Sequence, residues 1–127
     1  TFGRRFNTDE FSGQMEAFLA LVKKELPNTA ILLTTPPECY RRVRSGKQRT
    51  YVRNDNTERA ARAIRNVAKK EEVACWDLLT TTGGKNSCRK WHSSRLMGWD
   101  RIHFTNEGYQ EQGTLLFRAF MESYNNR

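Results

Sequence analysis

Two short, largely apolar runs constrain the fold of this chain more than any other feature. They cover residues 30–35 and 73–79, and each follows a stretch with helical periodicity. A strand that is apolar on both faces is typical of a parallel sheet covered by helices. Because two parallel strands alone make a poor sheet, we expect further strands of the same sheet to lie upstream of Thr1.

The first predicted helix covers residues 8–26. Thr8 or Asp9 is its expected N-cap, acidic residues fill its first turn, and Pro27 ends it. Apolar residues recur along it at helical spacing and form one stripe: Phe11, Met15, Phe18, Val22 and Leu26.

Two further helices are predicted downstream. One starts at Asn56 or Thr57 and ends near residue 71, and the other covers residues 107–124. The apolar face of the first consists of Ala60, Ala63, Ile64, Val67 and Ala68. That of the second consists of Leu116, Phe117, Phe120, Met121 and Tyr124. The order helix, strand, helix, strand, helix predicts an α/β fold with a parallel sheet between helices.

Composition excludes two classes of protein. Hydrophobic residues make up 37% of the chain and aromatic residues 11%, which is too apolar for a chain that stays disordered. No apolar run approaches the roughly 20 residues that span a bilayer, so no membrane span is predicted. The chain begins at Thr1 without an initiator Met or a signal-peptide pattern, and we expect it to be processed or part of something longer.

Two polar segments connect the predicted elements. Residues 38–55 are expected to form a surface loop, and between Glu38 and Asp55 the loop has no acid but six basic residues: Arg41, Arg42, Arg44, Lys47, Arg49 and Arg53. With a net charge of +8, an anionic partner is one interpretation, and a solvated loop is the preferred one. No RNA-binding pattern or recognition helix occurs there, so nucleic acid is not an expected partner. Residues 80–106 form a second loop, whose length is typical of functional loops.

The three cysteines are Cys39, Cys75 and Cys88. The absence of a Cys-x-x-Cys pair excludes a zinc ribbon or a thioredoxin motif. Cys88 and His92 are four residues apart, but no second ligand pair accompanies them, so no metal is expected. Cys75 lies in an apolar run and is expected to be buried. Cys39 and Cys88 lie in the two loops, where an exported protein could join them in a disulfide.

Residues 99–109 carry the side chains best suited to chemistry. The segment follows the second predicted strand, and ligands of open α/β sheets bind beyond the carboxyl ends of the strands. Serine acyl transfer needs an imidazole that takes a hydroxyl proton and a carboxylate that fixes the imidazole tautomer. Asp100 and His103 are three residues apart and can place a carboxylate beside a ring nitrogen. We interpret them as such a pair; a surface Asp beside a packed His is the alternative that spacing leaves open.

This segment resembles the last conserved block of the SGNH, or GDSL-like, hydrolases. The resemblance rests on Asp-x-x-His, then Thr-Asn-Glu-Gly-Tyr, then an amphipathic C-terminal helix. It implies a three-layer sandwich of flavodoxin-like type with a parallel sheet, of which this chain supplies about two strands and three helices. It also implies that His103 is the general base and acid of a Ser-His-Asp triad and that Asp100 orients it.

The resemblance implies a carboxylic ester as substrate, such as an acylated carbohydrate or a lipid, and no cofactor. The polar, Trp-bearing loop at residues 83–99 favours the carbohydrate ester. Because many proteins of this kind are exported, we expect a periplasmic or secreted location. In that case Cys39 and Cys88 are the expected disulfide pair.

The chain departs from the family in its missing nucleophile. It contains no Gly-Asp-Ser block, no Gly-x-Ser-x-Gly motif, and neither the Gly nor the Asn block of the family's oxyanion hole. We therefore expect residues 1–127 to be the C-terminal part of a single SGNH domain and to be inactive alone. The N-terminal part is expected in a separate chain, in further residues, or in a swapped copy. Without it, residues 30–35 would form an exposed, uncharged sheet edge.

Two other functions remain open from the sequence. One is a non-catalytic basic binding module that uses residues 41–53, and the other is a degenerate hydrolase that lacks a nucleophile. Salt-dependent binding of polyanions would indicate the first. Ester turnover that depends on His103 would instead indicate an enzyme.

Overall fold

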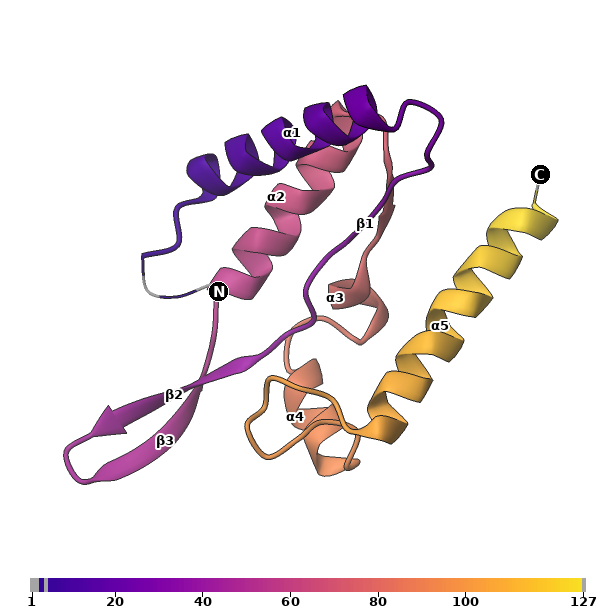
Figure 1. Ribbon diagram of the computed structural model, residues 1–127. Coiled ribbons are helices and arrows are strands. Elements are labelled where there is room, and N and C mark those ends of the chain that lie inside the picture. The colour runs from indigo at the N-terminus through magenta and orange to yellow at the C-terminus, as the bar shows by residue number, and fades with distance from the viewer. Residues whose placement is uncertain (1–2, 4, 127) are drawn as a thin grey trace. The chain divides into compact units, whose positions relative to one another are not determined.

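The computed structural model describes residue 3 and residues 5–126 (Figure 1). Its elements in chain order are α1 (Thr8–Glu25), β1 (Leu32–Thr34), β2 (Tyr40–Ser45), β3 (Gln48–Arg53), α2 (Asn56–Lys70), β4 (Ala74–Trp76), α3 (Leu78–Thr81), α4 (Ser87–Ser93) and α5 (Asn106–Asn125). The chain divides into two compact units. Unit 1 comprises Thr1–Pro37 and Asn54–Thr82, and unit 2 comprises Glu38–Arg53 and Gly83–Arg127.

Unit 1 contains the predicted parallel strand pair. β1 and β4 run parallel, with Leu32 opposite Ala74 and Thr34 opposite Trp76. Helix α2 packs against both strands, and α1 packs on α2. The parallel pairing is confirmed, but each strand is only three residues long, and Leu32 is 39% exposed. The expectation that both faces of these strands are buried is wrong for the described residues.

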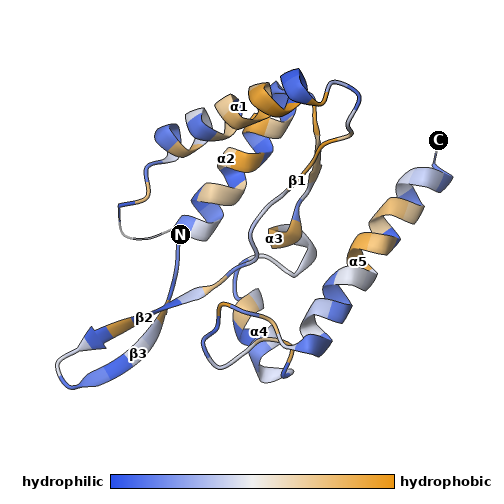
Figure 2. Ribbon diagram, in the orientation of Figure 1, coloured by the Kyte–Doolittle hydropathy of each residue, from blue (hydrophilic) through white to orange (hydrophobic). Residues whose placement is uncertain are grey.

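Helix α2 carries the best-packed face of unit 1. All five residues predicted for its inner face are buried, together with two neighbours: Thr57, Ala60, Ala61, Ala63, Ile64, Val67 and Ala68. Figure 2 shows this apolar face beside the polar surface of the same helix. The prediction of the α2 core face is confirmed. A strong 3.6-residue period identifies the buried face of a helix without knowledge of the element that packs on it.

The N-caps lie one or two residues before the predicted ones. The Asn7 side chain caps α1 by accepting hydrogen bonds from the backbone amides of Asp9 (3.0 Å) and Glu10 (3.1 Å). At α2, the N-cap is Asp55, and the Asn54 side chain before it accepts from the Asn56 amide at 3.3 Å. The capping role expected of Thr8 or Asp9, and of Asn56 or Thr57, is therefore wrong, although Asn7 and Asp55 both belong to residue types that favour the N-cap position.

Asp77 ends the second predicted strand three residues early. Its carboxylate accepts from the Thr80 amide and hydroxyl, which starts α3, and from the Thr35 hydroxyl at 2.9 Å. Arg65 forms an ion pair with it at 3.0 Å. Burial alone would raise the pKa of Asp77, but the hydrogen bonds from Thr80 and Thr35 and the Arg65 charge lower it overall. A carboxylate with so many partners makes a helix cap rather than a strand residue.

Unit 2 begins with a β-hairpin where the sequence predicted a loop. Strands β2 and β3 pair antiparallel from Tyr40 opposite Arg53 to Ser45 opposite Gln48. Gly46 begins the two-residue turn with φ +58°, a conformation that favours glycine. The arginines along both strands obscured the alternation of β-forming residues. The prediction of a loop at residues 38–55 is therefore wrong, because most of this segment forms a hairpin.

The second predicted loop, at residues 80–106, is also partly helical. It contains α4 and the end of α3. A cluster of buried residues, Tyr40, Cys88 and Met97, forms the core of unit 2, and Tyr51, Trp91 and Phe104 pack on it. The hairpin and the former loop thus share one core.

Buried Glu38 joins the hairpin to α4. One carboxylate oxygen lies 2.7 Å from Arg53 Nε and accepts the Asn86 amide at 3.0 Å, and the other accepts the Cys88 amide at 3.0 Å. The Glu38 side chain is fully buried. A buried carboxylate must be both paired and hydrogen-bonded, and these three donors meet that need.

The apolar stripe of α5 is exposed. Figure 2 shows apolar residues concentrated in the middle of this helix, and the exposed ones are Phe117, Phe120, Met121 and Tyr124. Across residue 3 and residues 5–126, no helix combines the length and the apolarity that crossing a membrane requires.

The cysteines differ from expectation in two ways. Cys75 is exposed rather than buried, because its short strand is covered incompletely. Cys88 is a buried free thiol whose Sγ lies 3.2 Å from Met97 Sδ. The expected pairing of Cys39 with Cys88 is therefore not formed in this structure.

We expect Cys88 to resist alkylation. Burial, reinforced by the nearby Glu38 carboxylate, raises the pKa of Cys88 to about 12, and the thiolate is the reactive form. Burial also raises the pKa of Cys75, but that side chain is exposed. Treatment with iodoacetamide near neutral pH, followed by peptide mass spectrometry, should label Cys75 at least about tenfold faster than Cys88. Equal labelling rates, or a Cys39–Cys88 disulfide-linked peptide, would contradict this arrangement.

Candidate active site

Residues 97–104 form a closed turn in unit 2 that presents the predicted pair. The turn lies between α4 and α5 in Figure 1. Met97 and Phe104 form an antiparallel bridge at its base. Above it, the Gly98 amide donates to the His103 carbonyl at 2.7 Å, and the Arg101 amide donates to the Gly98 carbonyl at 3.0 Å. These bonds hold the backbone on both sides of Asp100 and His103.

Asp100 contacts His103 directly. Asp100 Oδ2 lies 2.7 Å from His103 Nδ1. Its other oxygen, Oδ1, accepts the backbone amides of Ile102 (2.9 Å) and His103 (3.0 Å). The predicted approach of a carboxylate oxygen to a ring nitrogen is confirmed. One oxygen shapes the turn while the other faces the imidazole, so the spacing of three residues serves both contacts.

These contacts keep the Asp100 carboxylate ionised. Burial alone would raise the pKa of Asp100, but the hydrogen bond from the His103 side chain and those from the Ile102 and His103 amides lower it overall. An ionised carboxylate at Nδ1 favours the tautomer with a proton on Nδ1 and a lone pair on Nε2. This contact therefore leaves Nε2 as the unprotonated nitrogen of the His103 ring.

The remaining face of the imidazole is open. The His103 side chain is 72% exposed, and no described residue forms a hydrogen bond with Nε2. The neighbouring Trp99 is 74% exposed. An exposed imidazole can receive a proton from a hydroxyl at Nε2, and the exposed Trp99, next to Asp100 in the sequence, can support a bound ligand.

Arg101 fixes the turn to the hairpin, a role that sequence reasoning missed. Its carbonyl accepts the Tyr40 amide at 3.1 Å, and its guanidinium carbon lies 4.8 Å from the Tyr51 ring centroid and 5.7 Å from that of Tyr40. Arg101 adopts φ +56°, which is unfavourable for a residue other than glycine. The sequence signal was a pair of tyrosines, Tyr40 and Tyr51, which share one face of the unrecognised hairpin.

The start of α5 closes the turn from the other side. The Thr105 hydroxyl caps the helix by accepting the Gly108 amide at 3.2 Å, and it donates to the Arg95 carbonyl at 2.9 Å. The Thr105 amide donates to the Leu96 carbonyl at 3.1 Å. The Thr-Asn-Glu-Gly-Tyr segment therefore fixes the start of α5 to the residues that precede the turn, two positions after His103.

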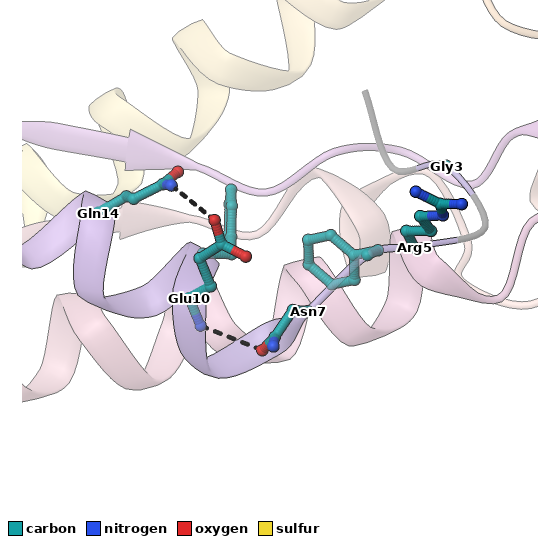
Figure 3. Close-up of a pocket in the computed structure, with 7 residues that line it drawn as sticks. Gly3, Arg5, Asn7, Glu10 and Gln14 are labelled. Atoms are coloured by element: carbon teal, nitrogen blue, oxygen red, sulfur yellow. Dashed lines mark hydrogen bonds between the residues drawn. The ribbon is translucent and has the colours of Figure 1, made fainter.

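The structure contains other candidate groups. His92 is half-buried in α4, and its carbonyl accepts the Arg95 amide. Within the described part of the chain, no group of three or more His, Cys, Asp or Glu side chains could hold a metal ion. In unit 1, a pocket of about 330 Å3 lies at the start of α1 (Figure 3). Its polar groups bond to one another, as Gln14 does to Glu10 at 3.2 Å.

The chain belongs to the GDSL-like Lipase/Acylhydrolase family, whose description matches residues 2–111. This family match confirms the SGNH resemblance inferred from the sequence. No curated protein sequence matches the chain.

Three solved structures share its fold. A peptidoglycan O-acetylesterase has a TM-score of 0.83 at 20% identity over 99% of this chain and 35% of its own. The esterase domain of the ORF1 protein from the zebrafish ZfL2-1 retrotransposon has a TM-score of 0.66 at 13% identity, over 92% and 61%. A lipase/acylhydrolase from Enterococcus faecalis has a TM-score of 0.60 at 19% identity, over 91% and 52%. The chain thus spans from about a third to about three fifths of these proteins, and the mixed α/β class with a parallel sheet is confirmed.

Proposed function

We propose that this chain supplies the acid–base half of a serine esterase. The 2.7 Å contact between Asp100 Oδ2 and His103 Nδ1 carries the proposal, because it occurs in a member of an acylhydrolase family. A Ser-His-Asp triad requires this carboxylate–imidazole pair, and the exposed ring leaves Nε2 accessible to a hydroxyl.

In the proposed reaction, His103 Nε2 takes the proton of a serine hydroxyl as its oxygen attacks the ester carbonyl. The imidazolium that forms is stabilised by Asp100 and returns the proton to the departing alcohol. Water then cleaves the acyl-enzyme. His103 removes a proton from water as the water oxygen bonds to the acyl carbon, and the bond between that carbon and the serine oxygen breaks. The serine recovers the proton from His103, and the carboxylic acid leaves. Asp100 stays ionised throughout, in keeping with its lowered pKa.

We propose that the nucleophile and the oxyanion hole come from sequence outside these 127 residues. The chain has no Gly-Asp-Ser or Gly-x-Ser-x-Gly segment. Ser12 precedes a glycine but lies within α1, where its hydroxyl donates to the Thr8 carbonyl at 2.9 Å. The exposed apolar residues of β1 and α5 support a missing partner, either the N-terminal portion of the same domain or a swapped copy.

The proposed substrate is an acyl ester of a carbohydrate. Trp99, which is exposed and adjacent to Asp100, offers an aromatic face on which a sugar ring can stack. A structural neighbour is a peptidoglycan O-acetylesterase. Both observations favour a carbohydrate ester over a lipid.

Asp100→Asn tests the orienting role in the complete enzyme. Asparagine keeps the Oδ1 acceptor for the Ile102 and His103 amides but replaces the charged oxygen at Nδ1 with an NH2 donor, which favours the tautomer without a basic Nε2. We expect kcat for p-nitrophenyl acetate to fall by about 10^3- to 10^4-fold with KM little changed. Circular dichroism should match the parent. Turnover within about threefold of the parent would reject the assignment.

A further inference from the structure

We propose that the β2–β3 hairpin binds an acidic polysaccharide through one face, and that this polymer carries the ester. Charge and geometry define the binding surface. The choice of a polysaccharide over other polyanions rests on the proposed function.

The hairpin register places four arginines on one face: Arg53 at the base, opposite Tyr40, and three nearer the tip. Residues directly opposite in an antiparallel pair share a face, and side chains alternate along each strand. Arg42 lies opposite Tyr51, and Arg44 lies opposite Arg49. Arg42, Arg44 and Arg49 therefore share a face, which we call the arginine face. Arg41 lies on the other face, opposite Val52.

The arginines at the base and at the tip of the hairpin differ in whether an acidic side chain neutralises them. At the base, Arg53 is neutralised by the buried Glu38 carboxylate at 2.7 Å. Towards the tip, the three arginines of the arginine face are exposed, and no described acid forms an ion pair with them. Like charges directly across a strand pair, such as Arg44 and Arg49, destabilise a hairpin. An anion bound between the two guanidinium groups would offset this repulsion, because it attracts both of them.

The arginine face suits a regular chain of carboxylates. Side chains two residues apart on a strand are about 7 Å apart, and opposite side chains are about 5 Å apart. All three cations are arginines, whose planar guanidinium pairs with carboxylate through two parallel hydrogen bonds. A linear polymer with a carboxylate on successive sugar rings can engage several of them together.

Family membership favours a polysaccharide over a nucleic acid. The family comprises lipases and acylhydrolases, whose substrates are acyl esters. Sugar hydroxyls of a polysaccharide can carry acyl groups, whereas the linkages of a nucleic acid backbone are phosphodiesters. An acylated acidic polysaccharide therefore satisfies both the charge of the hairpin and the chemistry of the family.

The arginine face continues into the candidate active site within unit 2. Tyr51, opposite Arg42 on this face, has its ring 4.8 Å from the Arg101 guanidinium carbon. Arg101 lies in the turn between Asp100 and His103. A polymer held along the hairpin would thus run towards the turn that holds the acid–base pair.

Binding can be measured without catalysis. Fluorescence or calorimetric titration with oligogalacturonate should show binding that weakens with salt, and neutral dextran of equal length should not bind. The triple variant Arg42→Gln, Arg44→Gln and Arg49→Gln should raise Kd at least about tenfold and flatten the dependence of log K on log salt concentration. A charge-matched control that changes three other exposed or half-exposed arginines, Arg41→Gln, Arg89→Gln and Arg118→Gln, should stay within about threefold of the parent.

Three results would overturn the proposal. They are the absence of oligogalacturonate binding, equal weakening in the two triple variants, and tighter binding of an oligothymidylate of equal charge, which would indicate a nucleic-acid surface. His103→Ala should bind oligogalacturonate like the parent, so a failed esterase assay and a failed binding assay are separate results. If Asp100→Asn keeps full turnover, the serine-esterase proposal fails while binding at the arginine face is still judged by these titrations.

Discussion

His103→Ala is expected to abolish ester turnover in the complete enzyme, lowering kcat by at least about 10^4-fold. Among the described residues, no imidazole other than that of His103 forms a hydrogen bond with Asp100 Oδ2. In the proposed mechanism, removal of His103 leaves neither the nucleophile nor the leaving alcohol with a proton carrier. The measurement is the steady-state rate for a short p-nitrophenyl ester, with the uncatalysed rate subtracted.

The second histidine provides a matched control. His92 lies half-buried in α4, outside the turn at residues 97–104. His92→Ala should therefore leave kcat within about threefold of the parent. Added imidazole, which can diffuse into the space left by the removed ring, should restore part of the turnover of His103→Ala. Equal losses in the two histidine variants would mean that the assay reports folding, and undiminished turnover in His103→Ala would reject the esterase mechanism.

The sequence predicted best those elements whose pattern is local and strong. The α2 face at Ala60, Ile64 and Val67 was predicted correctly because helical periodicity needs no knowledge of the packing partner. The Asp100–His103 contact was predictable for the same reason, since both residues belong to one tight turn. Local spacing alone brings these groups together.

The hairpin was missed because its signal is divided between two strands. Tyr40, Val43 and Val52 favour strands, but arginines between them raised the polarity of the segment to that of a loop. Gly46 marked the turn and was the one local signal available. Arg101 and Glu38 were missed with it, because their partners Tyr51 and Arg53 lie on the second strand.

The strands at residues 30–35 and 73–79 were located correctly, but their predicted lengths were too great. An apolar run predicts burial, yet it does not say how far backbone pairing extends. Asp77 ended the second strand because its carboxylate satisfies the amide that starts α3. Leu32 remained exposed, since burial of β1 depends on neighbours that the sequence pattern cannot supply.

Gly108→Ala is expected to destabilise unit 2 strongly, by about 3 kcal/mol. Gly108 is buried in the first turn of α5, and a Cβ there would overlap the Leu96 carbonyl oxygen and lie 3.0 Å from the Phe104 Cβ. The Leu96 carbonyl cannot move aside freely, because it accepts the Thr105 amide at 3.1 Å. The variant must therefore displace α5 from the turn that carries His103. Urea denaturation followed by Trp fluorescence measures the loss.

Gly113→Ala, in the same helix, is the matched control. A Cβ at Gly113 meets nothing within 4 Å, and φ there is not positive. Alanine should therefore stabilise α5 by about 0.5–1 kcal/mol through its higher helix propensity. Opposite signs for the two variants would show that the glycine of the Thr-Asn-Glu-Gly-Tyr segment is needed for close backbone packing. If both variants were stabilised alike, α5 would not pack on Leu96, and His103 would lose the support that we attribute to this helix.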